Sequence, residues 1–201
     1  MPRGIAPILL LGLVAGCGSD NGTSGALTNA DAPFSARFVE RTIFNVESDR
    51  PGKTTRGAFN WDTMTGWAED RTGNLVIRTV QVGDRCFRRT GKQPWTKSTA
   101  SDPEGTCSFA LFGSPKSEFG LLKEVAGLEA VGKDEIRKTQ TTHYHGVLSI
   151  AAVQGTIDVW VDGAGVVRRS RQVGEGDSFT ETRDYYDFGA DVTVQPPNLS
   201  S

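Results

Sequence analysis

The segment Thr139 to Val173 is the part of this 201-residue chain that most constrains its fold. It contains three runs typical of strands, Thr142 to Val147, Ile157 to Asp162 and Val166 to Gln172. The last two are joined by a short turn, Asp162 to Gly165. Asp-Gly between alternating runs is a strong hairpin signal, because glycine adopts the positive φ that a tight turn matching strand twist requires. The segment therefore predicts antiparallel β-structure.

The hairpin also predicts which side of the sheet is covered. Successive side chains of a strand point to opposite faces. Ile157, Val159 and Val161 share one face, whereas Trp160 lies between two aspartates on the other. We expect the aliphatic face to point inward and Trp160 to lie on the outer face.

The N-terminus has the pattern of an exported protein. A single cation, Arg3, precedes an apolar run from Ile5 to Val14, which is shorter than the about twenty residues that a membrane-spanning helix needs. Val14-Ala15-Gly16-Cys17 resembles the bacterial lipobox, in which the cysteine is acylated and becomes the new N-terminus. Acyl chains contribute about 0.8 kcal/mol per buried methylene and hold a domain at a membrane. We expect residues 1–16 to be a signal peptide and Cys17 to be lipidated; the alternative is an ordinary signal peptide with a chance cysteine.

The three cysteines fit this interpretation. Lipidation of Cys17 leaves Cys86 and Cys107, which an oxidising envelope compartment would allow to form a disulfide. Two unpaired buried thiols are the alternative. Zinc binding is not expected, because neither cysteine has a close Cys or His neighbour in the sequence.

Composition divides the rest of the chain. Residues 17–33 are rich in Gly, Ser, Thr, Asn and Asp, which predicts a flexible tether. Residues 34–197 have the length of one domain with a core, and 198–201 form a tail. Removing residues 1–16 takes one Arg from the 22 Lys and Arg, leaving 21 against 24 acids and a formal charge of −3. This balance argues against a nucleic-acid partner and against a polybasic membrane patch.

The folded domain is predicted to be a meander of strands with one helix. Runs rich in β-branched and aromatic residues recur about every ten residues, with turn signals between them. Further predicted strands are Phe34 to Val46, Gly57 to Trp67, Asn74 to Val82, Arg85 to Arg89, Trp95 to Lys97 and Phe179 to Phe188.

Only one stretch has helical periodicity. Ser114 suits an N-cap, apolar residues follow at helical spacing, and Gly127 ends the run. The pattern predicts a helix from Pro115 to Ala126, whose apolar side holds Leu121, Leu122 and Val125. The predicted fold class is therefore α+β, with the helix covering one face of an antiparallel sheet.

Four blocks of the sequence, in this order, resemble a known family. The resemblance is to the LppX/LprG/LprA/LprF actinobacterial lipoproteins, which are distantly similar to the LolA and LolB lipoprotein carriers. It covers Phe34 to Pro197 and is clearest from Leu111 onward. The blocks are GLEAVG at 127–132, TTHYHG at 141–146, DVWVDGAGVVRR at 158–169 and DFGADVTV at 187–194.

The resemblance implies a strongly curved antiparallel sheet, a half-barrel, packed over one or a few α-helices with an apolar cavity between them. Some members of the family carry acylated lipids across the cell envelope, and a concave apolar pocket is what acyl chains require. Family members begin with an amphipathic helix, for which this chain has only Ala26 to Ser35 available, interrupted by Pro33. We expect the cavity to be lined by Leu121, Leu122, Val125, Ile157, Val159 and Val161, the first three serving the core as well.

Motifs for other chemistry are absent from the sequence. His143 and His145 are the only histidines and lack a neighbouring carboxylate or cysteine, which is too few ligands for a metal. There is no Gly-x-Ser-x-Gly elbow, no dinucleotide fingerprint and no phosphate-binding glycine loop. The arginines suit either contact with a lipid phosphate or sulfate near a cavity mouth, or a solvated strand face; they are Arg88, Arg89, Arg168, Arg169 and Arg171.

Two functional hypotheses follow. The first is a non-enzymatic lipoprotein, anchored to the outer face of the cytoplasmic membrane, that binds the acyl chains of a lipid, acylated glycolipid or lipoprotein. We expect it to be a monomer without a cofactor. The second is a protein-interaction or envelope-sensor module on the same scaffold, with a filled core and no lipid cargo.

Overall fold

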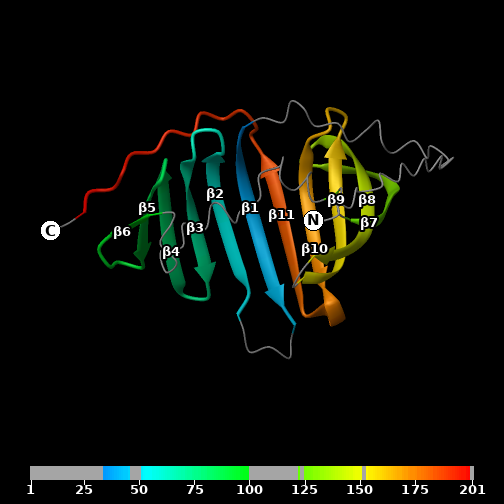
Figure 1. Ribbon diagram of the computed structural model, residues 1–201, viewed down its shortest axis with the longest axis horizontal. Helices are drawn as coiled ribbons and strands as arrows, with labels where there is room; N and C mark the ends of the chain where they lie inside the picture. The colour runs from blue at the N-terminus through cyan, green and yellow to red at the C-terminus, as the bar shows by residue number, and fades with distance from the viewer. Residues whose placement is uncertain (1–33, 46–50, 100–121, 123–124, 151–152, 200–201) are drawn as a thin grey trace, which may run out of the picture.

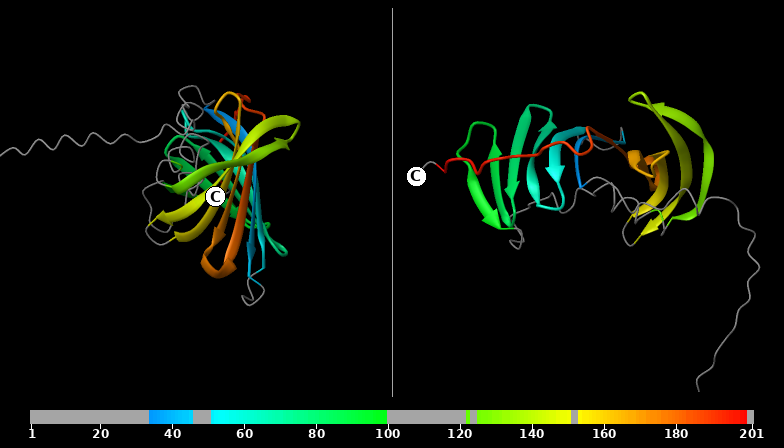
Figure 2. Two further views of the ribbon diagram at one scale, coloured as in Figure 1. Left: turned by 90° about the vertical axis from the view of Figure 1, so that its right-hand side faces the viewer. Right: turned by 90° about the horizontal axis from the view of Figure 1, so that it is seen from above.

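The computed structural model describes residues 34–45, 51–99, 122, 125–150 and 153–199. These residues form one antiparallel sheet of eleven strands in the order β6-β5-β4-β3-β2-β1-β11-β10-β9-β8-β7. The first and last strands along the chain, β1 and β11, therefore lie side by side in the middle of the sheet (Figure 1). The sheet is curved, and the strands at its β7 end bend into arcs (Figure 2).

Strands that follow each other along the chain are neighbours in the sheet, except for β6 and β7, which are its two edges. The strands are β1 (Ser35–Phe44), β2 (Lys53–Asn60), β3 (Thr65–Thr72), β4 (Leu75–Val82), β5 (Arg85–Thr90), β6 (Thr96–Thr99), β7 (Ala126–Ile136), β8 (Thr139–Ile150), β9 (Val153–Asp162), β10 (Val167–Gly174) and β11 (Phe179–Tyr186). A short 3-10 turn, Glu175–Asp177, joins β10 to β11. No helix among the described residues is long and apolar enough to span a membrane.

The two faces of the sheet differ in burial. On β1, Ala36, Phe38, Glu40 and Thr42 are buried, whereas Arg37 and Arg41 between them are exposed. We call the face that carries Phe38 the inner face and the face that carries Arg41 the outer face. Because paired residues share a face, the strand register extends this division across the whole sheet.

The hydrophobic core lies on the inner face. It joins residues from both halves of the sheet with Leu122 and Val125, which precede β7. Its buried members are Ala36, Phe38, Phe59, Ala68, Leu122, Val125, Tyr144, Leu148, Ile157, Val159, Val161, Val167 and Tyr185. At Gly57 two strands and the core meet so closely that an added Cβ would lie 2.3 Å from the Trp67 carbonyl oxygen and 2.9 Å from the Phe38 ring.

The predicted hairpin is confirmed. β9 and β10 pair antiparallel, and Asp162 Oδ1 accepts hydrogen bonds from the backbone N–H groups of Ala164, at 2.9 Å, and Val166, at 3.0 Å. Gly165 has φ of 79°, in the left-handed region that glycine enters without a steric penalty. Local sequence alone therefore fixes this part of the fold.

The α+β fold class is wrong. Among the described residues the elements are strands and one 3-10 turn, so the sheet has no described helix packed against it. Most of the predicted helix, Pro115 to Ala126, lies outside the described residues, and its last residue, Ala126, instead begins strand β7. The antiparallel sheet accounts for the described architecture, and Leu122 is the one described residue of the predicted helix that has helical backbone geometry.

Two strand assignments also need correction. The predicted strand Gly57 to Trp67 spans the end of β2, a turn and the start of β3. Asn60 Oδ1 accepts hydrogen bonds from the backbone N–H groups of Asp62, at 3.0 Å, and Thr63, at 3.1 Å, and this Asn-centred turn reverses the chain. β7 was not predicted as a strand, because most of its residues are exposed at the edge of the sheet and show no alternation.

Candidate functional site

The inner face changes character along the central strands. Near the start of β1, Phe38 lies beside Tyr185 of β11 in the apolar core. Two residues further along β1, Glu40 pairs in register with Arg183 of β11 and with Thr55 of β2. All three of these polar residues are buried. The apolar core therefore ends at a polar strip in the middle of the sheet.

The strip is held by a buried ion pair. Glu40 Oε2 accepts hydrogen bonds from Arg183 Nε at 3.0 Å and from Arg183 Nη2 at 2.6 Å. Arg183 Nη2 also donates to Glu181 Oε1 at 3.0 Å, and Lys53 Nζ lies 3.5 Å from Glu40 Oε1. Glu40 is 2% exposed and Arg183 is 8% exposed, so each charge depends on the other for its solvation.

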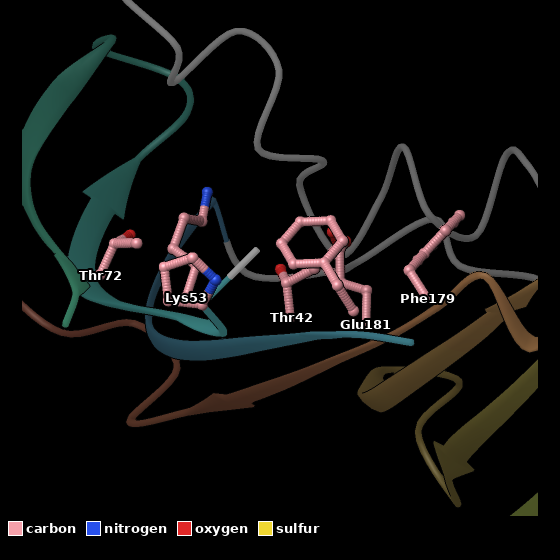
Figure 3. A pocket seen from close by; sticks show the side chains of 7 residues that line it. Thr42, Lys53, Thr72, Phe179 and Glu181 are labelled. Carbon is pink, nitrogen blue, oxygen red and sulfur yellow. The ribbon is translucent and has the colours of Figure 1, made fainter. Parts of the chain in front are cut away.

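Beyond the strip the inner face opens into a cleft of about 520 Å³. Figure 3 shows Thr42, Lys53, Thr72, Phe179 and Glu181 standing on the same side of the sheet around it. The remaining lining residues are Phe44 and Pro51. The cleft thus combines apolar walls with two charged side chains and lies within the size range of small-ligand sites, about 300–1,000 Å³.

The residues predicted to line a cavity lie elsewhere on the inner face. Five of the six belong to the buried core cluster, with exposed fractions below 9%; they are Leu122, Val125, Ile157, Val159 and Val161. The sixth, Leu121, is outside the described residues. None of the five lines the 520 Å³ cleft, and their role in ligand binding stays a prediction.

The sequence could not point to the cleft residues. Phe44 and Phe179 are at the ends of β1 and β11, and only the register places them opposite each other. Pro51 and Lys53 lie between two predicted strands, those ending at Val46 and beginning at Gly57, but Lys53 is the first residue of β2. The available signal was the alternation of β1, which puts Thr42 and Phe44 on the face of Phe38.

The three cysteines are only partly described. Cys86, on the inner face of β5, is buried and disulfide-bonded. Cys17 and Cys107 lie outside the described residues. Lipidation of Cys17 and pairing of Cys86 with Cys107 therefore stay predictions.

On the outer face the structure supplies the carboxylate that the two histidines lacked in the sequence. Asp158 Oδ1 lies 2.9 Å from His143 Nε2 and 2.8 Å from His145 Nδ1. Both ring nitrogens are directed at this single oxygen, and no group of three ligands suited to a metal ion occurs in the described part of the chain. Burial alone would raise the pKa of Asp158, but the hydrogen bonds with His145 and His143 outweigh it and lower the pKa below its ordinary value.

Trp160 lies on the outer face, as its alternation predicts. Its ring stacks on His143 with centroids 4.3 Å apart, and its Nε1–H donates to Asp134 Oδ2 at 2.7 Å. Arg169, next to it on β10, binds both carboxylate oxygens of Asp184. These contacts explain how an outer-face tryptophan becomes buried by polar neighbours rather than by the core.

Glu69 of β3 is the centre of a second outer-face cluster. It accepts hydrogen bonds at 2.9 Å from Arg56, Arg71 and Arg78. Only 5% of Glu69 is exposed, whereas the arginine side chains are 42% to 58% exposed. Burial alone would raise the pKa of Glu69, but hydrogen bonds from Arg71 and Arg78 lower it overall. The carboxylate is thus covered by guanidinium groups that face the solvent.

The described residues therefore contain an apolar cleft, a buried ion pair and surface charge clusters. Comparison with solved structures identifies the architecture. Lipoprotein LppX from Mycobacterium tuberculosis matches with a TM-score of 0.59 and 16% identity, over 85% of this chain and 93% of that chain. LprF from Mycobacterium bovis matches with a TM-score of 0.57 and 14% identity, over 82% and 90%.

This chain has the LppX/LprF-type fold. The resemblance stated from the sequence blocks is thus confirmed at the level of the fold. The match covers most of the length of both mycobacterial proteins. No protein-family model and no curated protein sequence matches the chain.

Proposed function

We propose that this protein is an exported, membrane-anchored lipoprotein that binds the acyl chains of a lipid or acylated lipoprotein on the inner face of its sheet, without catalysis. The observation that carries the proposal is the 520 Å³ cleft, which is walled by Phe44, Pro51 and Phe179. Apolar walls of this kind remove methylene groups from water, at roughly 0.8 kcal/mol for each one buried.

The charged residues at the cleft suit the other end of an amphiphile. Lys53 and Glu181 line the cleft next to the Glu40–Arg183 pair. A ligand that places its chain against the phenylalanines brings its polar group to this strip. The LppX/LprF-type fold and the lipobox at Cys17 support the same assignment, with residues 17–33 as the tether.

The test is to express the chain from residue 18 onward, which retains every described strand, and to extract it for lipid mass spectrometry. We expect bound lipid in the wild-type chain and less lipid in Thr72→Trp, because the indole would occupy the cleft. Thr182→Trp is the matched control, since Thr182 pairs with Arg41 on the outer face. Absence of lipid from all three proteins would contradict the proposal.

A second candidate is a protein-interaction module on the same scaffold. It is favoured by the packing of the predicted lining residues, among them Ile157 and Val159, into a filled core. Large apolar side chains are also exposed at Ile43, Val131 and Val147. A pull-down from membranes that yields one stoichiometric protein partner and no lipid would support this candidate over the first.

A further inference from the structure

The outer face carries a continuous band of arginines that crosses most of the sheet. One row of paired residues runs from Arg89 through Arg78, Glu69 and Arg56 to Val39, and continues through Asp184 to Arg169. The neighbouring row contains Arg71, Arg41 and Arg171. We call these seven residues the arginine band: Arg41, Arg56, Arg71, Arg78, Arg89, Arg169 and Arg171.

The band has a net positive charge after its ion pairs are counted. Four acids lie among or beside the arginines on this face, namely Glu69, Asp134, Asp158 and Asp184. Seven arginines against four acids leave a formal charge of +3, whereas the whole chain has −2. The negative charge of the whole chain does not reveal this basic surface, because the acids that outweigh its positive charge lie elsewhere in the chain.

Three arginines of the band remain available to a partner: Arg41, Arg56 and Arg71. Arg41 is exposed and makes no ion pair or hydrogen bond with the part of the chain that the structure describes. Arg56 and Arg71 share the single carboxylate of Glu69 with Arg78, so their remaining N–H groups face the solvent. Such guanidinium groups bind phosphate oxygens through two parallel hydrogen bonds.

Apolar side chains accompany the charge. Ile43 follows Arg41 on the outer face of β1 and is 63% exposed, and Trp67 precedes Glu69 on the outer face of β3 and is 37% exposed. Tryptophan is favoured at the boundary between membrane and water, where its ring lies among headgroups. This combination of arginine and exposed apolar residues suits a phospholipid surface better than a fully hydrated anion.

The predicted anchor at Cys17 gives this surface a membrane to face. Residues 17–33 join the predicted lipid anchor to β1, and the arginine band crosses β1 at Arg41. A fully extended chain spans at most about 3.6 Å per residue, so the tether allows the domain to lie against the bilayer.

We propose that the arginine band docks on the anionic phospholipid surface of the membrane that carries the anchor. The inference rests on the proposed membrane location and adds the orientation: the outer face lies on the bilayer, and the inner-face cleft faces away from it. The predicted lipid anchor then holds the chain at the membrane, and the basic face sets the orientation of the domain on it.

The test uses the unlipidated chain from residue 18 onward, which contains all described strands, so that binding does not depend on the anchor. Co-sedimentation with phosphatidylcholine vesicles is compared with vesicles that also contain phosphatidylglycerol. We expect binding only to the anionic vesicles and loss of binding at high salt. Equal binding to both vesicles, or no binding to the anionic ones, would overturn the inference.

Two triple variants separate charge from structure. Arg41→Gln/Arg71→Gln/Arg171→Gln should weaken binding to anionic vesicles about a hundredfold, since each basic residue at an anionic surface contributes roughly a factor of five. The matched variant Arg41→Lys/Arg71→Lys/Arg171→Lys keeps the charge and should bind within a few-fold of wild type. A Gln triple that stays folded and binds like wild type overturns the inference.

The two proposals fail separately. Extracted lipid without binding to anionic vesicles overturns the docking surface and leaves the proposed cargo function intact. Vesicle binding without extracted lipid overturns the proposed cargo function and leaves the docking surface intact.

Discussion

The two faces of the sheet use the same pair of charged groups in opposite surroundings. On the inner face, Glu40 binds Arg183, and both are almost fully buried. On the outer face, Glu69 binds Arg56 and Arg78, whose guanidinium groups are about half exposed. Water can replace a lost partner on the outer face but not on the inner face, so burial, rather than the identity of the pair, sets its energetic role.

The comparison also separates stability from recognition. The inner ion pair lies between the apolar core and the cleft, and Glu40 and Arg183 bind each other. The outer arginines outnumber their carboxylates and keep free donor groups. The first arrangement specifies one structure, and the second provides a surface for an external anion.

The largest effect expected from this contrast is at Arg183. Arg183→Leu leaves Glu40 charged and buried with Lys53, at 3.5 Å, as its remaining cation partner in the described part of the chain. Removing one partner of a buried pair destabilises a protein by about 3–5 kcal/mol, measurable by urea unfolding. The double variant Glu40→Leu/Arg183→Leu should recover most of this loss. If Arg183→Leu lowers the free energy of unfolding no more than the loss of an exposed ion pair does, burial does not set the energetic role of the pair.

One pair of matched substitutions compares the faces without charge. Ile157 is 2% exposed on the inner face, and Ile43 is 63% exposed on the outer face. Ile157→Val should lower the free energy of unfolding by about 0.5–1.5 kcal/mol, because a methylene group leaves a packed site. Ile43→Val should stay within about 0.5 kcal/mol of wild type. Equal losses in thermal or urea unfolding would show that the two faces are equally buried.

A smaller effect is expected at Glu69. Glu69→Gln removes three surface ion pairs, each worth about 0.2–1 kcal/mol at most, and leaves arginines that water can solvate. The loss of unfolding free energy should shrink as salt is added, since exposed charges are screened. Glu40→Gln is the matched inner-face variant, and its larger loss should change little with salt.

The smallest effect concerns pH. The pKa of Glu69 is lowered in the folded state from its ordinary value of 4.5. A lowered folded pKa gives stability that is present above pH 4.5 and is lost as the pH falls through the folded value. The difference in unfolding free energy between wild type and Glu69→Gln should therefore disappear in acid. A difference that is constant from neutral pH into acid would contradict the role of the three arginines.

The sequence predicted local features better than positions of contact. The turn at Asp162 to Gly165 and the alternation around Val159 follow from neighbouring residues, and both agree with the structure. The predicted α+β class was wrong, because no helix element among the described residues packs against the sheet; most of the predicted helix lies outside those residues. β7 was missed because an exposed edge strand has no buried side to produce alternation.

The candidate site was harder to predict for a different reason. Residues 157, 159 and 161 were correctly placed on the inner face, but the cleft opens at Phe44 and Phe179, near the far ends of β1 and β11. Alternation assigns each residue to a face, yet it does not say which row of the sheet remains open. That depends on the register between strands that are distant in the chain.

By itself, the sequence determined the antiparallel character of the chain, the faces of its clearest strands and the resemblance that led to the LppX/LprF-type fold. The tertiary structure alone decided that Glu40 meets Arg183, 143 residues later, and that arginines from six strands form one band. The physical reason is that side-chain alternation is set by the local backbone, whereas strand register is set by packing across the whole sheet.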